Sequence, residues 1–314
     1  MDRPYILHMF TPGRQMSPFD INMAADAGYQ LVVPYTEVAL ASIAGLTQDT
    51  IFSRGPKGVV RTGIFIGGRD ALLAADMLGA AGAAMVPPFV VSLMADPSGA
   101  YTTAAAMVAC VEAALLGQPG GAAVGARAGG LAGRRMLVLG GTGPVGRMAG
   151  VIAARAGAEV FLSSRNGLAA AEQAAAETGR RFGVTLQGVS GADSVALRQS
   201  LAQAEVLLAC AAAGHQVVSA DDLAAARALR VAADVNAVPP SGIAGVAVMD
   251  NGAGLVGTGA LGIGALAVGN VKYQTQQRLL LQMRQSAKPL VLALDEAFAT
   301  ARACLAERPA GPGA

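Results

Sequence analysis

Short apolar runs alternate with alanine-rich stretches along almost the whole chain of 314 residues. This alternation is typical of α/β folds, in which strands and helices follow one another. In the first third, the apolar runs have few polar interruptions, which suits parallel strands covered on both faces of a sheet. These runs begin at Tyr5, Tyr29, Thr62 and Phe89.

Three helices are predicted between and after these strands. The first begins at Pro18, because Ser17 is a suitable N-cap and proline fits the first helical position. It extends to about Ala27. The second covers about Arg69–Gly82, and the third extends from near Thr103 to Gly117.

The composition changes after Gly117, where residues 117–133 are rich in glycine and alanine and show no apolar period. Such a stretch is typical of a flexible connection, so we expect a linker over residues 119–133.

After residue 133 the alternation of apolar runs and alanine-rich stretches restarts. Strands are predicted at residues 134–141, 158–164, 206–211, 229–235 and 246–250. Helices are predicted at residues 143–157 and 167–183 and, between Gly262 and Glu307, as two stretches separated near Lys288-Pro289.

Composition excludes several classes of protein. The net charge of +2 provides no basic surface for nucleic acid or an anionic membrane. Three widely spaced cysteines and two histidines indicate neither a metal site nor a disulfide framework, and they suit reduced thiols in the cytoplasm. The mean hydropathy of +0.47 raises the question of whether part of the chain crosses a membrane. However, Pro87-Pro88 and several glycines interrupt the two long uncharged stretches, Met77–Ala95 and Gly252–Val271. We therefore expect buried strands and loops there and a cytoplasmic protein.

The clearest motif is a GxGxxG that follows a predicted strand and opens a predicted helix. In dinucleotide-binding βα units, the first glycine makes the tight turn, the second lets the backbone approach the pyrophosphate, and the third allows close packing of helix and strand. The phosphates lie at the helix N-terminus, where free N–H groups favour anions. The motif predicts a Rossmann-like unit that binds NAD or NADP through Gly141, Thr142, Gly143, Pro144, Val145 and Gly146.

The end of the next strand distinguishes the two cofactors. An acidic residue there would bind the ribose 2′-hydroxyl of NAD, but this chain has Ser163, Ser164 and Arg165. A guanidinium beside hydroxyl groups suits the 2′-phosphate of NADP. We therefore expect NADP to bind at least as well as NAD.

Candidate catalytic residues are harder to identify, because the chain has no Tyr-x-x-x-Lys, GxSxG, HExxH or P-loop motif. A hydride donor whose product is a resonance-stabilised cation requires no base, and its enzyme works by positioning and by excluding water. Polar residues in apolar or glycine-rich surroundings are then the candidates. They are Asp20, Asn22, Asp96, Ser98, Thr102, Thr103, Asp234, Asn236, Asn270 and Lys272.

Lys272 is the only charged residue between Asp250 and Arg278. An isolated lysine of this kind either extends its ammonium group from a helix to water or is held in a cleft. The residues alone leave these two alternatives open.

Several long strings resemble the NAD(P)-dependent methylene-tetrahydromethanopterin dehydrogenases of bacterial one-carbon metabolism. The similarity covers nearly the whole chain and includes the strings MSPFDINMA, GLTQDTIFSRGP, VRTGIFIGG, ADPSGAYTTAAAMVA, AADVNAVPPSGIAG and GIGALAVGNVKYQTQ. This resemblance implies hydride transfer from methylene-tetrahydromethanopterin to NAD(P)⁺ in formaldehyde oxidation, giving the methenyl form. It also implies a homo-oligomer and two α/β domains separated by a cleft. The pterin domain would comprise residues 1–118 and 272–314, and the nucleotide domain residues 134–271.

The resemblance implies roles for individual residues. Lys272 corresponds to an active-site lysine, and Thr102 and Thr103 would line the same cleft. We assign Lys272, Thr102 and Asp20 to catalysis. The assigned substrate ligands are Asn22, Asp96, Ser98, Thr103 and Asn270, and Asp234 and Asn236 are assigned to the cofactor.

The expected reaction restricts what Lys272 can do. An ammonium group beside a developing cation would raise the barrier, so we expect Lys272 to bind the polar edge of the pterin or to be neutral in the closed site. Asp20 would accept paired hydrogen bonds from the amino-pyrimidinone ring, or would only complement a helix dipole. Three rival functions stay open: methylene-tetrahydrofolate dehydrogenase, dihydropterin reductase and a non-catalytic NAD(P) sensor.

Overall fold

The computed structural model describes residues 3–117 and 130–307 and confirms the α/β class. The chain divides into two compact units, and each contains its own sheet of mostly parallel strands. The first unit consists of Met1–Thr102 and Tyr273–Thr300, and the second of Thr103–Lys272 and Ala301–Ala314.

The first unit has a five-stranded parallel sheet in the order β12-β4-β3-β1-β2. Two of its inner strands, β3 and β4, are fully buried, as the unbroken apolar runs predict. Pro34 lies in the edge strand β2, where the missing N–H costs no ladder hydrogen bond. The strands are β1 (Ile6–Phe10), β2 (Leu31–Tyr35), β3 (Thr62–Ile66), β4 (Ser92–Ala95) and β12 (Val291–Leu292).

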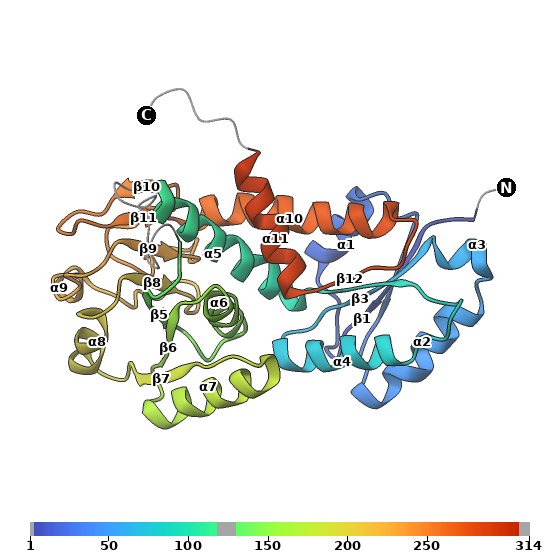
Figure 1. Cartoon of the computed structure of the whole chain (residues 1–314), viewed down its shortest axis with the longest axis horizontal. Coiled ribbons are helices and arrows are strands. Elements are labelled where there is room, and N and C mark those ends of the chain that lie inside the picture. Colours follow the sequence, from blue (N-terminus) through green and yellow to red (C-terminus); the bar gives the residue numbers. More distant parts are fainter. Residues whose placement is uncertain (1–2, 118–129, 308–314) are drawn as a thin grey trace. The chain divides into compact units, whose positions relative to one another are not determined.

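Helices cover both faces of this sheet. In Figure 1, α2 and α4 lie on one side of β1 and β3, and α1 and α10 lie on the other. The predicted start of α1 at Pro18 is confirmed, although the Ser17 side chain makes no capping hydrogen bond. The elements of this unit are α1 (Pro18–Asp26), the 3₁₀ turn η1 (Leu40–Ser42), α2 (Ile43–Phe52), α3 (Pro56–Val59), α4 (Ala71–Ala83) and the 3₁₀ turn η2 (Pro97–Gly99). Three helices are divided between the two units: α5 (Ala100–Gly117), α10 (Ala265–Gln285) and α11 (Leu294–Ala306).

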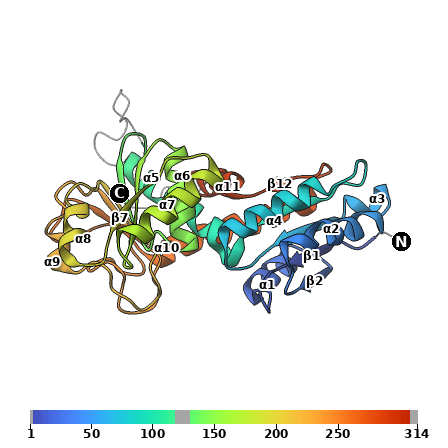
Figure 2. The same ribbon diagram turned by 90° about the horizontal axis from the view of Figure 1, so that it is seen from below.

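The second unit has a seven-stranded sheet in the order β10-β11-β9-β8-β5-β6-β7, which is parallel except for β10. Helices α6 and α7 pack beside β6 and β7 (Figure 2). The strands are β5 (Arg135–Leu139), β6 (Glu159–Ser164), β7 (Gln187–Ser190), β8 (Val206–Ala209), β9 (Val231–Asp234), β10 (Asn251–Gly254) and β11 (Leu261–Ile263). The helices are α6 (Pro144–Arg155), α7 (Leu168–Phe182), α8 (Ser194–Leu201) and α9 (Ala220–Leu223).

The strand predicted at residues 246–250 is wrong. The chain turns there, because the Asp250 carboxylate accepts a hydrogen bond from the Ala247 N–H at 2.8 Å. A Cβ atom on Gly264 would lie 2.1 Å from the Ala247 carbonyl oxygen, so a neighbouring segment packs directly on this turn. Two short strands, β10 and β11, follow instead.

The boundary between the compact units differs from the expected one. It falls between Thr102 and Thr103, inside α5, and not at the glycine-rich stretch after Gly117. The reason is that α5 packs on the second unit: Cys210 Sγ lies 3.6 Å from Met107 Sδ. Most of the expected linker, residues 118–129, lies outside the described residues.

One described helix, Pro97–Gly117, is long and apolar enough to cross a membrane by length and composition. However, 72% of its most apolar window is buried inside the protein, as in the core helix of a globular fold. The two stretches that raised the membrane question form other structures. Residues 77–95 form the end of α4, a loop and β4, and residues 252–271 form most of β10, β11 and the start of α10.

Candidate functional site

The glycine motif forms the turn between β5 and α6, as predicted, and the glycine before the motif also takes part: the Gly143 N–H donates to the Gly140 carbonyl oxygen at 3.0 Å, and Gly141 lies inside this turn. Gly140 has φ +70°, and a Cβ atom on it would lie 2.6 Å from the carbonyl oxygen of Cys210. Gly141 also packs against β6, where a Cβ atom would lie 2.8 Å from that of Leu162. The turn therefore requires glycine at both positions.

The other two glycines of the motif have different surroundings. A Cβ atom on Gly146 would lie 2.5 Å from the Gly140 carbonyl oxygen, so Gly146 allows the close packing that the motif predicts. A Cβ atom on Gly143 would meet only that same oxygen, at 3.3 Å. Apart from the two adjoining residues of the chain, no other atom of the described residues lies within 4 Å of that Cβ position. The side of Gly143 is therefore open, and a ligand can approach its backbone there.

The N-terminus of α6 fits a pyrophosphate group. Gly143 is the N-cap and Pro144 is the first helical residue, so no side chain caps this end. The first N–H groups of a helix have no carbonyl partner within it, and together with the helix dipole they attract anions. Arg147 braces the turn, because its Nε donates to the Thr142 carbonyl oxygen at 3.0 Å and its guanidinium pairs with Glu177 at 3.2 Å.

At the end of β6, the three residues expected to contact the ribose differ in exposure. Ser163 and Ser164 are buried, and Ser164 Oγ accepts a hydrogen bond from the Asn166 N–H at 3.1 Å. Arg165 is exposed. Of the three, the guanidinium is the group that the fold leaves accessible to a 2′-phosphate.

At the end of β9, Asp234 and Asn236 hold their own loop together. The Asp234 carboxylate accepts hydrogen bonds from the N–H groups of Asn236 at 2.9 Å and Ile243 at 3.1 Å. Burial raises the pKa of Asp234, although backbone hydrogen bonds oppose this shift. The Asn236 amide in turn binds the backbone of Gly214, Val238 and Pro240. Both side chains therefore shape the loop, and their contact with a cofactor stays a prediction.

The first unit has a pocket of about 710 Å³ at the carboxyl end of its sheet. Segments that follow β1, β3 and β4 form its wall, which is where α/β folds bind ligands. Ser98 is the one predicted site residue among the lining residues. The lining consists of Thr11, Pro12, Gly13, Arg14, Gln15, Ser17, Pro18, Gly68, Arg69, Asp70 and Ser98.

Two of the predicted residues near this pocket lock the start of α5. Asp96 and Thr102 are completely buried, and Thr102 Oγ1 donates to Asp96 Oδ2 at 2.6 Å. The other carboxylate oxygen of Asp96 accepts from the N–H groups of Tyr101 and Thr102. Because the Thr102 hydroxyl is committed to this internal bond, the structure supports a positioning role, and its catalytic assignment stays a prediction.

Ser98 lies on the other side of the same loop in a strained conformation. Its φ of +51° is unusual for a residue with a side chain, and its hydroxyl donates to the Gly68 carbonyl oxygen at 2.7 Å. A strained conformation of this kind persists only where the surrounding structure enforces it, and such residues are common at functional sites. The bond ties the loop after β4 to the loop after β3.

Asp20 and Gln276 are joined across α1 and α10. Gln276 Nε2 donates to Asp20 Oδ1 at 2.7 Å, and both side chains are buried. Asp20 therefore does more than complement a helix dipole, and its contact with a pterin ring stays a prediction. Its neighbour Asn22 is exposed on the same helix.

Lys272 and Asn270 both lie on α10, where Lys272 is half-buried and Asn270 is exposed. Lys272 precedes Gln276 by four residues, so the two side chains lie on one face of the helix. Thr103, which follows the locked Thr102, is half-buried. Lys272 and Thr103 lie at two of the three places where the chain passes between the two compact units; the third lies between Thr300 and Ala301.

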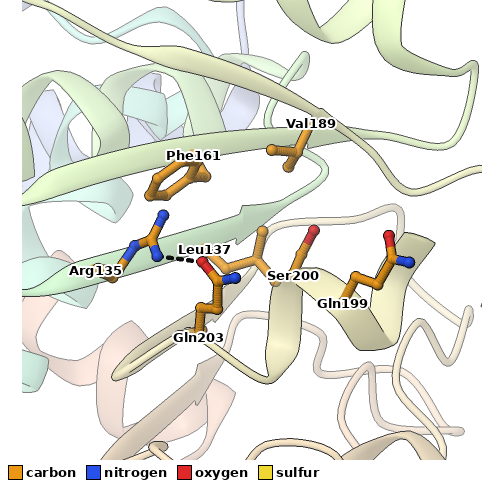
Figure 3. A pocket seen from close by; sticks show the side chains of 8 residues that line it. Arg135, Leu137, Phe161, Val189, Gln199, Ser200 and Gln203 are labelled. Carbon is orange, nitrogen blue, oxygen red and sulfur yellow. Dashed lines mark hydrogen bonds between the residues drawn. The ribbon is translucent and has the colours of Figure 1, made fainter. Parts of the chain in front are cut away.

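A second pocket, of about 210 Å³, lies in the second unit between its sheet and α8 (Figure 3). It contains none of the predicted site residues. Its guanidinium, that of Arg135, is already engaged: it lies over the Phe161 ring, binds Gln203 and pairs with Glu159 at 3.2 Å. Arg135 begins β5, whereas the glycine turn follows the end of that strand, so this pocket is separate from the cofactor turn.

The described residues contain no group of three or more histidine, cysteine or acidic side chains that could hold a metal ion. Sequence reasoning missed several residues of the candidate sites: Gly140, Gln276, Arg14, Gln15 and Arg69. Gly140 directly precedes the motif, and Gln276 ends the string GIGALAVGNVKYQTQ, which also contains Lys272. The two arginines had no signal in the sequence, because nothing there shows that the loops after β1 and β3 share a pocket.

Comparisons with known proteins relate the chain to one family. A family model described as the N-terminal part of methylene-tetrahydromethanopterin dehydrogenase matches residues 18–98. The chain is 46% identical over 293 residues to the NAD(P)-dependent methylenetetrahydromethanopterin dehydrogenase of Methylorubrum extorquens, which covers 93% of this chain and 96% of that protein.

Two further proteins are more distant. The bifunctional protein MdtA of the same organism is 30% identical over 247 residues, which is 79% of this chain and 81% of that protein. Among solved structures, quinate dehydrogenase from Corynebacterium glutamicum in complex with NAD is 10% identical, with a TM-score of 0.49 over 95% of this chain and 98% of that one.

Proposed function

This chain belongs to the family of NAD(P)-dependent methylenetetrahydromethanopterin dehydrogenases, and from this premise we propose how its two units perform the reaction. The enzyme transfers a hydride from methylene-tetrahydromethanopterin to NAD(P)⁺ and forms the methenyl product. The observation that carries this conclusion is 46% identity over 93% of the chain. The intact glycine turn before α6 supports it independently.

The chemistry requires positioning more than proton transfer. When hydride leaves the methylene carbon, the positive charge is shared with the two flanking nitrogen atoms, so no base has to remove a proton. When bound, the nicotinamide ring of NAD(P)⁺ supplies the hydride acceptor. The protein then has to align the two carbon atoms and exclude water.

The second unit holds the dinucleotide. The open N-terminus of α6 would hold the pyrophosphate, and Gly143 would let the cofactor backbone approach. Arg147 keeps the turn in place through its bonds to Thr142 and α7. The chain thus provides an anion site whose geometry exists before the cofactor binds.

Arg165 gives the enzyme its use of NADP beside NAD. Its exposed guanidinium follows β6 directly, and a charged hydrogen bond to the 2′-phosphate is worth about 1.5–3 kcal/mol. We expect Arg165→Ala to raise KM for NADP about tenfold or more and to leave KM for NAD unchanged. Arg180→Ala, at an exposed position late in α7, is the matched control. Equal changes for both cofactors would contradict this role.

The first unit holds the pterin. Its pocket lies at the carboxyl end of the sheet, and Ser98 contributes to the wall. Asn22 is exposed on the helix whose first residue, Pro18, lines the pocket. Lys272 orients the substrate through its polar edge, since an ammonium group next to the reacting carbon would oppose the developing cation.

The rate of reduction of NAD(P)⁺ with different carriers tests the proposed function. We expect turnover with methylene-tetrahydromethanopterin and a much lower kcat/KM with methylene-tetrahydrofolate. Turnover with the folate alone would favour the rival dehydrogenase. Oxidation of NAD(P)H by a dihydropterin, without oxidation of the methylene carrier, would favour a reductase.

The assembly and the location of the enzyme follow as further proposals. We propose a cytoplasmic homo-oligomer that binds neither nucleic acid nor membrane. The near-neutral net charge of +2 and the resemblance to the family support this proposal. Light scattering on the purified chain and fractionation of cells that produce it test both parts, and a monomer or a membrane-bound fraction would contradict them.

A further inference from the structure

Two arginines line the pocket of the first unit, and the proposed reaction does not use them. Arg14 lies in the segment after β1, and Arg69 lies in the segment after β3. Both side chains are exposed. Among residues 3–117 and 130–307, neither guanidinium takes part in a hydrogen bond, an ion pair or a ring contact.

The acidic residue of this pocket, Asp70, forms no ion pair with Arg14 or Arg69. Asp70 caps α4, and its Oδ1 atom accepts hydrogen bonds from the N–H groups of Leu72 at 2.9 Å and Leu73 at 3.0 Å. The carboxylate is thus used to satisfy helix N–H groups. With one negative and two positive side chains in its wall, the pocket has a net charge of about +1.

Hydrogen bonds hold the wall in a defined shape. The Glu37 N–H donates to the Gly13 carbonyl oxygen at 2.9 Å, and the Gly13 N–H donates to Thr11 Oγ1 at 3.2 Å. On the opposite side, Ser98 in its strained conformation holds the Gly68 carbonyl oxygen. The loops that carry Arg14 and Arg69 are therefore fixed by their backbone.

We propose that Arg14 and Arg69 together bind an anionic group on the side chain of the one-carbon carrier, at a distance from its pterin ring. A guanidinium presents several N–H donors in a fork that matches a phosphate or a carboxylate. Two such groups without protein partners in one preformed pocket are suited to an anion and would repel a cationic or apolar group. This inference rests on the proposed function, because it assigns the ligand to the substrate of that reaction.

Steady-state kinetics with methylene-tetrahydromethanopterin tests the pair. Arg14→Gln and Arg69→Gln should each raise KM for the carrier about tenfold, and the double variant should raise it more than either. The kcat value and KM for NADP should stay near those of the wild type, because the proposed pair binds the side chain of the carrier and not the carbon that gives up the hydride. Arg227→Gln changes an exposed arginine of the second unit and should alter neither KM.

Inorganic phosphate and the dicarboxylate succinate distinguish the two anion chemistries. The one that resembles the bound group should inhibit competitively against the carrier in the wild type and lose this inhibition in the double variant. A rise of KM for NADP instead of the carrier would mean that the pair binds the dinucleotide and would overturn the proposal. An unchanged carrier KM in the double variant would overturn it as well.

Isothermal titration calorimetry of anion binding tests the anion site separately from the proposed dehydrogenase function. If the wild type turns over no methylene carrier, the proposed function fails, but titration of the protein with inorganic phosphate or succinate still tests anion binding by the pair. Binding to the wild type that disappears in the double variant supports the anion site. Equal binding to both proteins, or to neither, contradicts it.

Discussion

The side-chain amide of Gln276 donates a hydrogen bond to the carboxylate of Asp20 over 2.7 Å, although the two residues are 256 positions apart in the sequence. Asp20 is 2% exposed and Gln276 is fully buried. The bond joins α1, whose first residue lines the substrate pocket, to α10, which carries Lys272. The bond therefore fixes α10, the helix that carries the predicted active-site lysine, against α1, the helix that begins in the wall of the pocket.

A double-mutant cycle on this pair measures the link. Asp20→Ala leaves a buried amide without its acceptor and should lower the free energy of unfolding by about 1–3 kcal/mol. Asp20→Asn keeps an oxygen acceptor and should cost less. Urea unfolding of Asp20→Ala, Gln276→Ala and the double variant gives the coupling energy. Additive losses would show that the bond contributes nothing to stability.

Much of the fold follows from local patterns in the sequence. The strand, glycine turn and helix from β5 to α6 are predicted almost to the residue, because the apolar run, the glycines and Pro144 act together over a short distance. The break between α10 and α11 is likewise predicted near Lys288-Pro289. These elements depend on neighbours in the chain.

Features that depend on distant contacts were not predictable. Position 140 requires glycine because the backbone of Cys210, 70 positions later, packs against it, and the motif does not include this position. The run at residues 246–250 is as apolar as a strand, yet Met249 is 70% exposed in a turn. The pairing of Arg14 with Arg69 in one pocket likewise comes from the order of the strands.

Lys272 is expected to orient the substrate without binding the dinucleotide. Lys272→Ala should lower kcat with methylene-tetrahydromethanopterin by about 10- to 100-fold, which is typical of lost positioning. The affinity for NADPH, measured by fluorescence titration, should change little. Tyr273→Phe, at an exposed neighbouring position, provides the control. Unchanged turnover in Lys272→Ala would reject the assignment.

Two glycines of the cofactor turn should respond differently to alanine. A Cβ atom at position 146 would lie 2.5 Å from the Gly140 carbonyl oxygen, so Gly146→Ala should lower both Tm and NADPH affinity. At position 143 the nearest atom, the same carbonyl oxygen, is 3.3 Å away and has to shift only by a few tenths of an ångström, so Gly143→Ala should lower Tm less than Gly146→Ala does. It should nevertheless weaken NADPH binding about tenfold or more, because its methyl group occupies the space of the pyrophosphate. Normal binding by a stable Gly143→Ala variant would show that the cofactor does not approach this residue.

The buried thiol of Cys210 should make the free energy of unfolding fall at alkaline pH. Burial, and secondarily the Asp234 carboxylate, raises the pKa of its thiol from 9.0 to about 12. The unfolded chain releases this proton near its ordinary pKa, whereas the folded chain retains it. The contribution of this thiol is therefore fully present below about pH 9 and is lost as the pH rises toward 12, by up to about 1.4 kcal/mol per pH unit.

Urea unfolding in this alkaline range checks the sign. Cys210→Ala should flatten the decline in stability above about pH 9 relative to the wild type. Tyr29→Phe is a useful comparison, because burial raises the pKa of that phenol too, and its contribution begins only above its ordinary value of 10.0. Identical slopes for the wild type and Cys210→Ala would contradict the raised thiol pKa.

The fate of an isotopic label tests most directly the claim that hydride passes from the methylene carbon to the nicotinamide without a proton-transferring base. The substrate is methylene-tetrahydromethanopterin with deuterium on the methylene carbon, and mass spectrometry of the reduced NADP reports the transfer. We predict one deuterium in each reduced nicotinamide and none released to water. Reduced NADP without deuterium, or deuterium recovered in the solvent, would contradict direct hydride transfer.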